Sequence, residues 1–112
     1  MKLTLTSSAI EKINELNKAN HNYIWLYYDT DDCGCGVSGM PSVRLTNSTD
    51  DAFESVENDN GEYEVIIHKQ QAVFFANQLT LDHLGNSFRL SSPEGILNPI
   101  IPDNDLVKGV VV

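Results

Sequence analysis

The sequence predicts a mainly β domain of the α+β class, with antiparallel strands and one N-terminal helix. Short apolar segments alternate with turn residues about every ten positions, which is typical of antiparallel strands. One segment alone, residues 8–19, has apolar side chains at helical spacing. The chain has 112 residues, a length that supports one hydrophobic core. We therefore expect a single domain over residues 1–112, with residues 100–112 as a candidate C-terminal tail.

The first elements predicted are a strand over residues 2–6 and a helix over residues 8–19. Ser8 and Glu11 match the S-x-x-E capping box. Apolar side chains recur every three or four positions along this helix, at Ile10, Ile13, Leu16 and Ala19. Residues 22–29 contain Tyr-Ile-Trp-Leu-Tyr-Tyr, which is apolar on both faces and too short for a helix. This segment predicts a central strand.

The rest of the chain predicts further strands joined by tight turns. Residues 42–46 alternate as a strand, and residues 53–57 are expected to pair with 63–68 across a turn containing Asn60-Gly61. A second hairpin pairs 78–82 with 87–91 across Gly85-Asn86. Residues 70–76 predict a helical turn. A loop containing Asn98-Pro99 is expected after Pro93, and an exposed tail or edge strand over residues 103–112.

The charge balance limits the choice of partners. Sixteen acidic and seven basic residues give a formal net charge of −9. Without a basic cluster, nucleic acid and anionic membranes are unsuitable partners, whereas cations and basic proteins suit the surface. The sequence contains neither an apolar run of about 20 residues nor a secretory signal. We therefore expect a cytoplasmic protein whose cysteines stay reduced.

The segment 29–41 is the candidate for chemistry, with Cys33, Cys35 and three glycines. Gly34, Gly36 and Gly39 match G-x-G-x-x-G, but a strand follows instead of the helix that a phosphate site needs. An EF-hand-type calcium loop also fails, because a thiol occupies the third position and Met40 the twelfth. Neither a nucleotide nor a calcium site is expected here.

Three interpretations of the two cysteines remain. A redox or nucleophilic thiol needs a nearby cation, whereas three aspartates flank the pair. A soft metal site fits better, since a bound cation deprotonates thiols and makes carboxylates favourable neighbours. Its remaining ligands must come from His68, His83, an aspartate or a second chain related by a twofold axis. The third interpretation is that both cysteines are small buried side chains without a ligand.

Several short motifs of the chain form a set. The N-terminal Leu5-Thr6-Ser7-Ser8-Ala9 is one, and the loop ending Ser38-Gly39-Met40 after its cysteines is another. Leu81-Asp82-His83, Phe88-Arg89-Leu90 and Asn98-Pro99 complete the set. Over about residues 3–99, the chain resembles the A-type iron–sulfur carriers, the HesB-like or IscA-like domain. This resemblance implies a HesB-like β-sandwich or barrel that binds iron or an iron–sulfur cluster and passes it to recipient proteins, often as a dimer.

One family feature is missing. The second Cys-Gly-Cys that usually follows Asn-Pro has no counterpart, because residues 100–112 contain no cysteine. Either Cys33 or Cys35 corresponds to the family's loop cysteine. The leading hypothesis is a non-enzymatic cluster assembly or carrier protein, with Cys33 and Cys35 as ligands of iron or an iron–sulfur cluster and with recipient apo-proteins, cluster assembly proteins or a second copy as partners. The alternatives are a HesB-like interaction module without metal and a thiol-redox protein.

Overall fold

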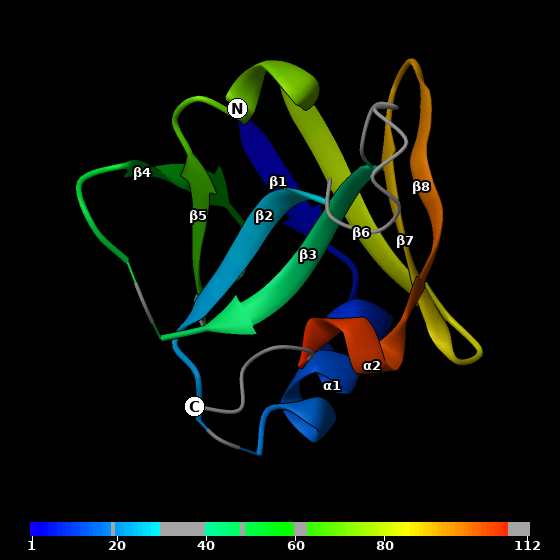
Figure 1. Ribbon diagram of the computed structural model, residues 1–112. Coiled ribbons are helices and arrows are strands. Elements are labelled where there is room, and N and C mark those ends of the chain that lie inside the picture. Colours follow the sequence, from blue (N-terminus) through cyan, green and yellow to red (C-terminus); the bar gives the residue numbers. More distant parts are fainter. Residues whose placement is uncertain (19, 30–39, 48, 60–62, 108–112) are drawn as a thin grey trace.

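The computed structural model describes residues 1–18, 20–29, 40–47, 49–59 and 63–107. In this part of the chain, eight strands form one sheet in the order β3-β2-β5-β4-β1-β6-β7-β8, which curls into a nearly closed barrel (Figure 1). The elements in chain order are β1 Lys2–Leu5, α1 Ser7–Leu16, β2 Tyr23–Asp29, β3 Met40–Thr46, β4 Phe53–Asn58, β5 Glu64–His68, η1 Ala72–Phe74, β6 Gln78–Leu84, β7 Ser87–Ser92, β8 Gly95–Pro102 and α2 Asp103–Leu106.

Helix α1 begins two residues earlier than the capping box predicts. Thr6 is the N-cap, and its hydroxyl accepts a hydrogen bond from the Ala9 N–H at 3.2 Å. The prediction of Ser8 as the cap was therefore wrong. The helix also ends early, because the Asn17 side chain accepts from the His21 N–H at 2.7 Å and donates to the His21 carbonyl at 2.9 Å. These two bonds turn the chain out of the helix, so His21 lies beyond its end.

The sheet is mixed, and the expectation of an antiparallel sheet was wrong. β1 pairs in parallel with both β4 and β6, and β2 pairs in parallel with β5. The strand pairs of the two predicted hairpins are confirmed, with Phe53 opposite His68 and Leu81 opposite Leu90. The predicted turn at Asn60-Gly61 lies outside the described residues. A pattern of alternating side chains states which face of a strand is buried, but it does not state which strand lies alongside or in which direction. The parallel pairs are therefore a property of the tertiary structure.

Residues 95–106 form a strand and a short helix, which corrects the loop expected after Pro93 and the start of the expected tail, whereas residues 108–112 lie outside the described residues. β8 pairs with β7 despite Pro99 and Pro102, because it is an edge strand and its register shifts along the pairing. Proline is tolerated at such positions since no ladder hydrogen bond is required from it. Helix α2 follows, and its Leu106 is only 1% exposed. The chain up to Val107 therefore belongs to the domain.

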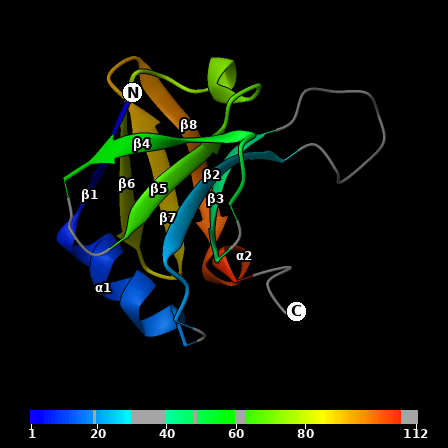
Figure 2. The ribbon, with the colours of Figure 1, turned by 90° about the vertical axis from the view of Figure 1, so that its left-hand side faces the viewer.

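The two helices lie at one end of the barrel and η1 at the other, as Figure 2 shows from the side. Ala9 and Ile13 of α1 and Leu106 of α2 are buried in the hydrophobic core. The inward side chains of the strands complete this core, among them Leu3, Ile24, Leu26, Val43, Leu45, Val65, Ile67, Leu81, Phe88 and Leu90. The helices therefore cover one open end of the barrel. Neither of them is long and apolar enough to cross a membrane, within the described part of the chain.

Replacing Leu81 by Ala should lower the free energy of unfolding by about 2–5 kcal/mol, because a fully buried side chain leaves a cavity. Leu84→Ala is the matched control on the same strand, since Leu84 is 54% exposed. Its effect should stay within about 0.5 kcal/mol. Urea unfolding followed by circular dichroism measures both. Equal effects of the two substitutions would contradict this assignment of the core.

Candidate functional site

The hairpin of β2 and β3 holds both ends of the segment that carries the two cysteines. We call the residues at this end of the hairpin, Tyr28, Asp29, Met40 and Pro41, the frame. The strands pair antiparallel from Tyr23 opposite Thr46 to Asp29 opposite Met40. Residues 30–39 connect the last pair, so the segment starts and ends on adjacent strands about 5 Å apart. Cys33, Cys35 and the three glycines, Gly34, Gly36 and Gly39, lie outside the described residues. The role of the two cysteines as ligands stays a prediction.

One side of this frame is fixed by η1. The Tyr28 N–H, one residue before the end of β2, donates a hydrogen bond to Gln71 Oε1 at 3.3 Å. The ring of Tyr28 stacks on that of Phe74, with 3.9 Å between ring centroids and 10° between planes. Phe74 and Val73 remain exposed to solvent. The end of β2 is thus held by a neighbouring turn that also presents apolar side chains.

The other side of the frame is fixed by the Asn98-Pro99 motif. Asn98 is 8% exposed, and its Nδ2 donates to the Pro41 carbonyl at 2.8 Å, which joins β8 to the start of β3. Its Oδ1 accepts from the Ile100 N–H at 3.3 Å. One amide side chain therefore bridges the two edge strands at the level of the frame. Asn98 was noted in the sequence only as part of a motif, and a buried asparagine beside a proline gives no local sign of such a bridge.

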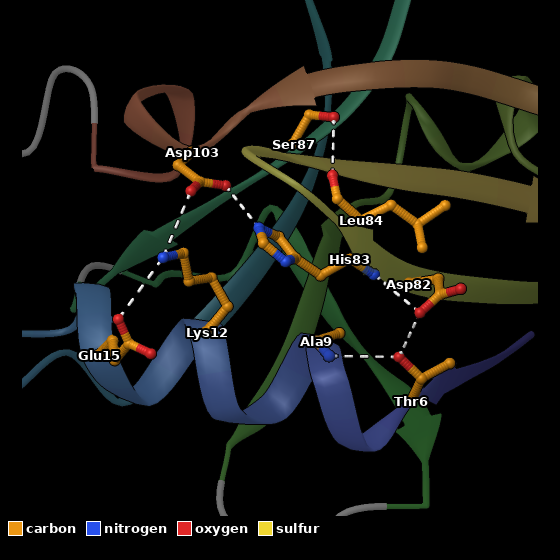
Figure 3. A network of polar contacts seen from close by, with 9 residues as sticks. All are labelled: Thr6, Ala9, Lys12, Glu15, Asp82, His83, Leu84, Ser87 and Asp103. Carbon is orange, nitrogen blue, oxygen red and sulfur yellow. Dashed lines mark hydrogen bonds and ion pairs between the residues drawn. The ribbon is translucent and has the colours of Figure 1, made fainter.

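The two candidate histidine ligands lie in different places. β5 runs parallel to β2, so His68 lies at the frame end of the sheet, where its Nδ1 accepts from the Gln70 N–H at 3.1 Å. His83 lies beside the helices at the opposite end, 2.8 Å from Asp103 of α2 (Figure 3). A metal held at the frame therefore cannot use His83 of the same chain. Among the described residues, no group of three or more histidine, cysteine, aspartate or glutamate side chains could hold a metal ion.

His83 belongs to a polar network that fastens both helices to β6 (Figure 3). Its Nε2 contacts Asp103 Oδ1, and Asp103 Oδ2 lies 3.7 Å from Lys12 Nζ on α1. Next to it, Asp82 Oδ1 accepts from the Thr6 hydroxyl at 2.7 Å and from the His83 N–H at 2.8 Å. The side chains of His83 and Asp103 are 10% and 16% exposed. The contacts of His83 with Asp103, of Asp103 with Lys12 and of Asp82 with Thr6 join β6, α2 and the N-terminal side of α1 to one another, so the role of the network is structural.

The environment of Asp82 favours its ionised form. The hydrogen bond from Thr6 is the main reason that the pKa of Asp82 lies below its usual value, and the His83 backbone bond adds to it. Arg89 lies opposite Asp82 on β7 and acts in the same direction. Relative to the protonated form, the ionised form of Asp82 is therefore more stable in the folded protein than in the unfolded chain.

Comparison with known proteins shows the family of this chain. Residues 1–102 match the family model described as iron–sulphur cluster biosynthesis. The chain belongs to this iron–sulphur cluster biosynthesis family, as the HesB-like and IscA-like resemblance implies. Uncharacterized protein YqkB of Bacillus subtilis (strain 168) is 32% identical over 102 residues, which cover 88% of this chain and 94% of YqkB.

Solved structures show the same fold at low identity. A proposed Fe–S biosynthesis protein from Lactobacillus acidophilus has a TM-score of 0.70 at 19% identity, covering 96% of this chain and 95% of its own. A second such protein, from Lactobacillus salivarius, has a TM-score of 0.69 at 15% identity, covering 90% and 94%. IscA with a [2Fe-2S] cluster has a TM-score of 0.58 at 17% identity, covering 81% and 82%. The predicted HesB-like fold is confirmed.

Replacing Asn98 by Ala should lower the free energy of unfolding by about 1–3 kcal/mol, because the Pro41 carbonyl loses its donor at a buried seam. Asn104→Ala is the control, since Asn104 is an exposed asparagine of α2. It should change stability by less than about 0.5 kcal/mol. Urea unfolding compares the two variants, and an Asn98→Ala protein as stable as the wild type would show that the Asn98 hydrogen bond does not stabilise the fold.

Asp82→Asn should lose about 1–2 kcal/mol of stability near neutral pH, where the wild-type carboxylate accepts its two hydrogen bonds. The folded pKa lies below the ordinary value of 3.8, so this stabilisation is complete above 3.8 and is lost as the pH falls through the folded pKa. The stability difference between wild type and variant should therefore shrink in acid. Urea unfolding of both proteins across that range measures it, and a constant difference contradicts it.

Proposed function

We propose that this protein is a cluster carrier that binds iron or an iron–sulfur cluster through the thiolates of Cys33 and Cys35 and delivers it to recipient apo-proteins. The metal or cluster is cargo, and the protein carries it without converting a substrate. We place this activity in the cytoplasm, where both thiols stay reduced. Membership of the iron–sulphur cluster biosynthesis family is the observation that carries the proposal.

The frame supports this proposal through its geometry. The pairing of Asp29 with Met40 joins the two ends of the cysteine segment on adjacent strands. Tyr28 and Pro41, beside these two ends, are each hydrogen-bonded to a residue outside the β2–β3 hairpin. Functional residues are often carried on loops whose ends a rigid scaffold holds in place. Three glycines within the segment let its backbone approach a bound group closely.

Two thiolates supply half of a four-coordinate site. His83 lies at the far end of the barrel, whereas β5 places His68 at the frame end. We propose that the remaining ligands come from His68, an aspartate, the same segment of a second chain or a recipient protein. A dimer of two such chains supplies four thiolates. Each subunit then gives up its share of the cargo when a recipient offers its own cysteines.

A second candidate is a family member that binds partners without metal. It is favoured by the absence of cysteine from residues 100–112, where the usual family members carry their Cys-Gly-Cys. The formal net charge of −9 suits a basic partner. In this case both cysteines can be replaced without loss of partner binding.

Anaerobic purification followed by reconstitution with iron and sulfide tests the carrier proposal. The wild-type protein should acquire a visible chromophore with stoichiometric iron and sulfide, because thiolates select iron–sulfur clusters. The double substitution Cys33→Ser/Cys35→Ser should abolish it. Absorption spectra and metal analysis on matched samples give the readout.

Thr49→Ala is the control variant, since Thr49 is exposed and lies outside the cysteine segment. It should bind cargo like the wild type. Thermal unfolding of the double variant shows whether the fold survives. A wild-type protein that binds neither iron nor sulfide, or a double variant that binds them equally well, would overturn the carrier proposal.

A further inference from the structure

The outer face of β3, β2, β5 and β4 carries a cluster of side chains that is separate from the core. One row across these strands consists of cross-strand neighbours, in the order Arg44, Trp25, Ile66 and Ser55. The next row contains Ser42 opposite Tyr27 and Phe53 opposite His68. Cross-strand neighbours share a face of the sheet. We call six of these residues the outer cluster: Trp25, Tyr27, Arg44, Phe53, Ile66 and His68.

Aromatic contacts hold the outer cluster together. The ring of Trp25 lies 5.3 Å from that of Tyr27 and 5.7 Å from that of Phe53, which it meets edge to face. Phe53 in turn meets His68 at 5.5 Å. Tyr27 and Ile66 are 6% and 3% exposed although both point away from the core. Because α1 and α2 lie at an end of the barrel (Figure 2), no helix of the described chain covers this packed aromatic face.

Arg44 is the cation of the outer cluster. Its Cζ lies 4.1 Å from the centre of the Tyr27 ring and 5.7 Å from that of Trp25. Its Nη2 donates to the Tyr27 hydroxyl at 3.0 Å. The ion pairs among the described residues involve Lys12 and His83, and none involves Arg44. In a chain with sixteen acidic and seven basic residues, a guanidinium that lies on aromatic rings, with no described carboxylate beside it, is available to an outside anion.

Two N–H donors of the outer cluster lack an acceptor. Arg44 Nε and Trp25 Nε1 are both shielded from water and have no hydrogen-bond partner in the part of the chain that the structure describes. A shielded donor without an acceptor destabilises the free protein, and binding an acceptor removes this cost. Trp25 and Arg44 are directly opposite each other on β2 and β3. Their side chains are therefore close enough to contact one small planar group.

We propose that the outer cluster binds a carboxylate side chain of a partner protein, with Arg44 as the anchor and the Trp25 N–H as the second donor. A guanidinium matches a carboxylate in shape and charge, and its planar fork donates two parallel hydrogen bonds. Tryptophan, tyrosine and arginine are also the residues that dominate binding energy at protein interfaces. Binding moves the Arg44 guanidinium off the Tyr27 ring and exposes both donors to the carboxylate.

One acidic residue on the same face of the sheet, Glu64, favours a carboxylate over a phosphate. Glu64 lies on the same face of β5 as Ile66, two residues away, and is exposed. Its negative charge repels a dianion more strongly than a monoanion. The outer cluster also shares the β2–β3 hairpin with the cysteine segment. A partner bound there lies on the strands whose ends, Asp29 and Met40, the cysteine segment connects.

Proton–nitrogen NMR on the metal-free protein tests this site, because Trp25 is the single tryptophan and its indole N–H gives one signal. The probe is the peptide N-acetyl-Gly-Asp-Gly-amide, and the matched control is its Asn counterpart. The Asp peptide should shift the Trp25 and Arg44 Nε–H signals to saturation with a Kd of about 1 mM or tighter. The Asn peptide and inorganic phosphate should leave both signals in place.

Variants of the two donors complete the test. Arg44→Gln should abolish the shift, and Arg44→Lys, which keeps the charge but not the fork, should weaken binding about tenfold. Trp25→Phe keeps a ring of similar position and should weaken the shift of the Arg44 signal severalfold, which covers the case in which an Arg44 variant unfolds. Equal shifts with the Asp and Asn peptides or with phosphate would overturn the proposal, as would no saturable shift. Self-association of the wild type that Arg44→Gln abolishes would also overturn it in favour of a second copy.

Discussion

The pairing of β2 with β3 is the interaction on which most of the structure depends. Seven consecutive residue pairs, from Tyr23 opposite Thr46 to Asp29 opposite Met40, fix the register. This register places Ile24 and Leu26 in the core and Trp25 and Tyr27 on the outer face. It also sets where the cysteine segment begins and ends. A shift by one residue would exchange the two faces, so core, outer cluster and candidate metal segment depend on the same hydrogen-bond ladder.

The barrel is closed by side chains where its backbone ladder stops. β3 and β8 are the two edges of the sheet, and the Asn98 amide reaches across to the Pro41 carbonyl. At the other end, Asp103 and Lys12 join the two helices, and His83 joins α2 to β6. These contacts separate the molecule into an end that is sealed by helices and an end that presents the frame. The separation leaves the end that carries the proposed cysteine site free of the structural network around His83.

The sequence predicted most local features of the chain, and each wrong prediction has a physical reason. The two hairpins and the central strand followed from turn residues and apolar alternation, and the pairs Phe53 with His68 and Leu81 with Leu90 confirm the hairpins. The N-cap was misplaced by two residues because Thr6 and Ser8 both carry the hydroxyl that caps a helix. β8 was missed because two prolines argue against a strand unless it is known to lie at an edge. The ligand role of the two cysteines stays a prediction.

By itself, the sequence determined the class of the domain and its family, and it singled out the segment between Asp29 and Met40 as the candidate for chemistry, which stays a prediction. These follow from short-range information: spacing, turn residues and motifs. The tertiary structure alone decided the parallel pairing of β1 with β6 and of β2 with β5, and the Asn98 bridge between β8 and β3. It also decided the position of His83 at the end of the barrel opposite the frame and the assembly of the outer cluster. Each of these joins residues that are distant in the chain, and an alternating pattern carries no information on which distant strand a given strand will meet.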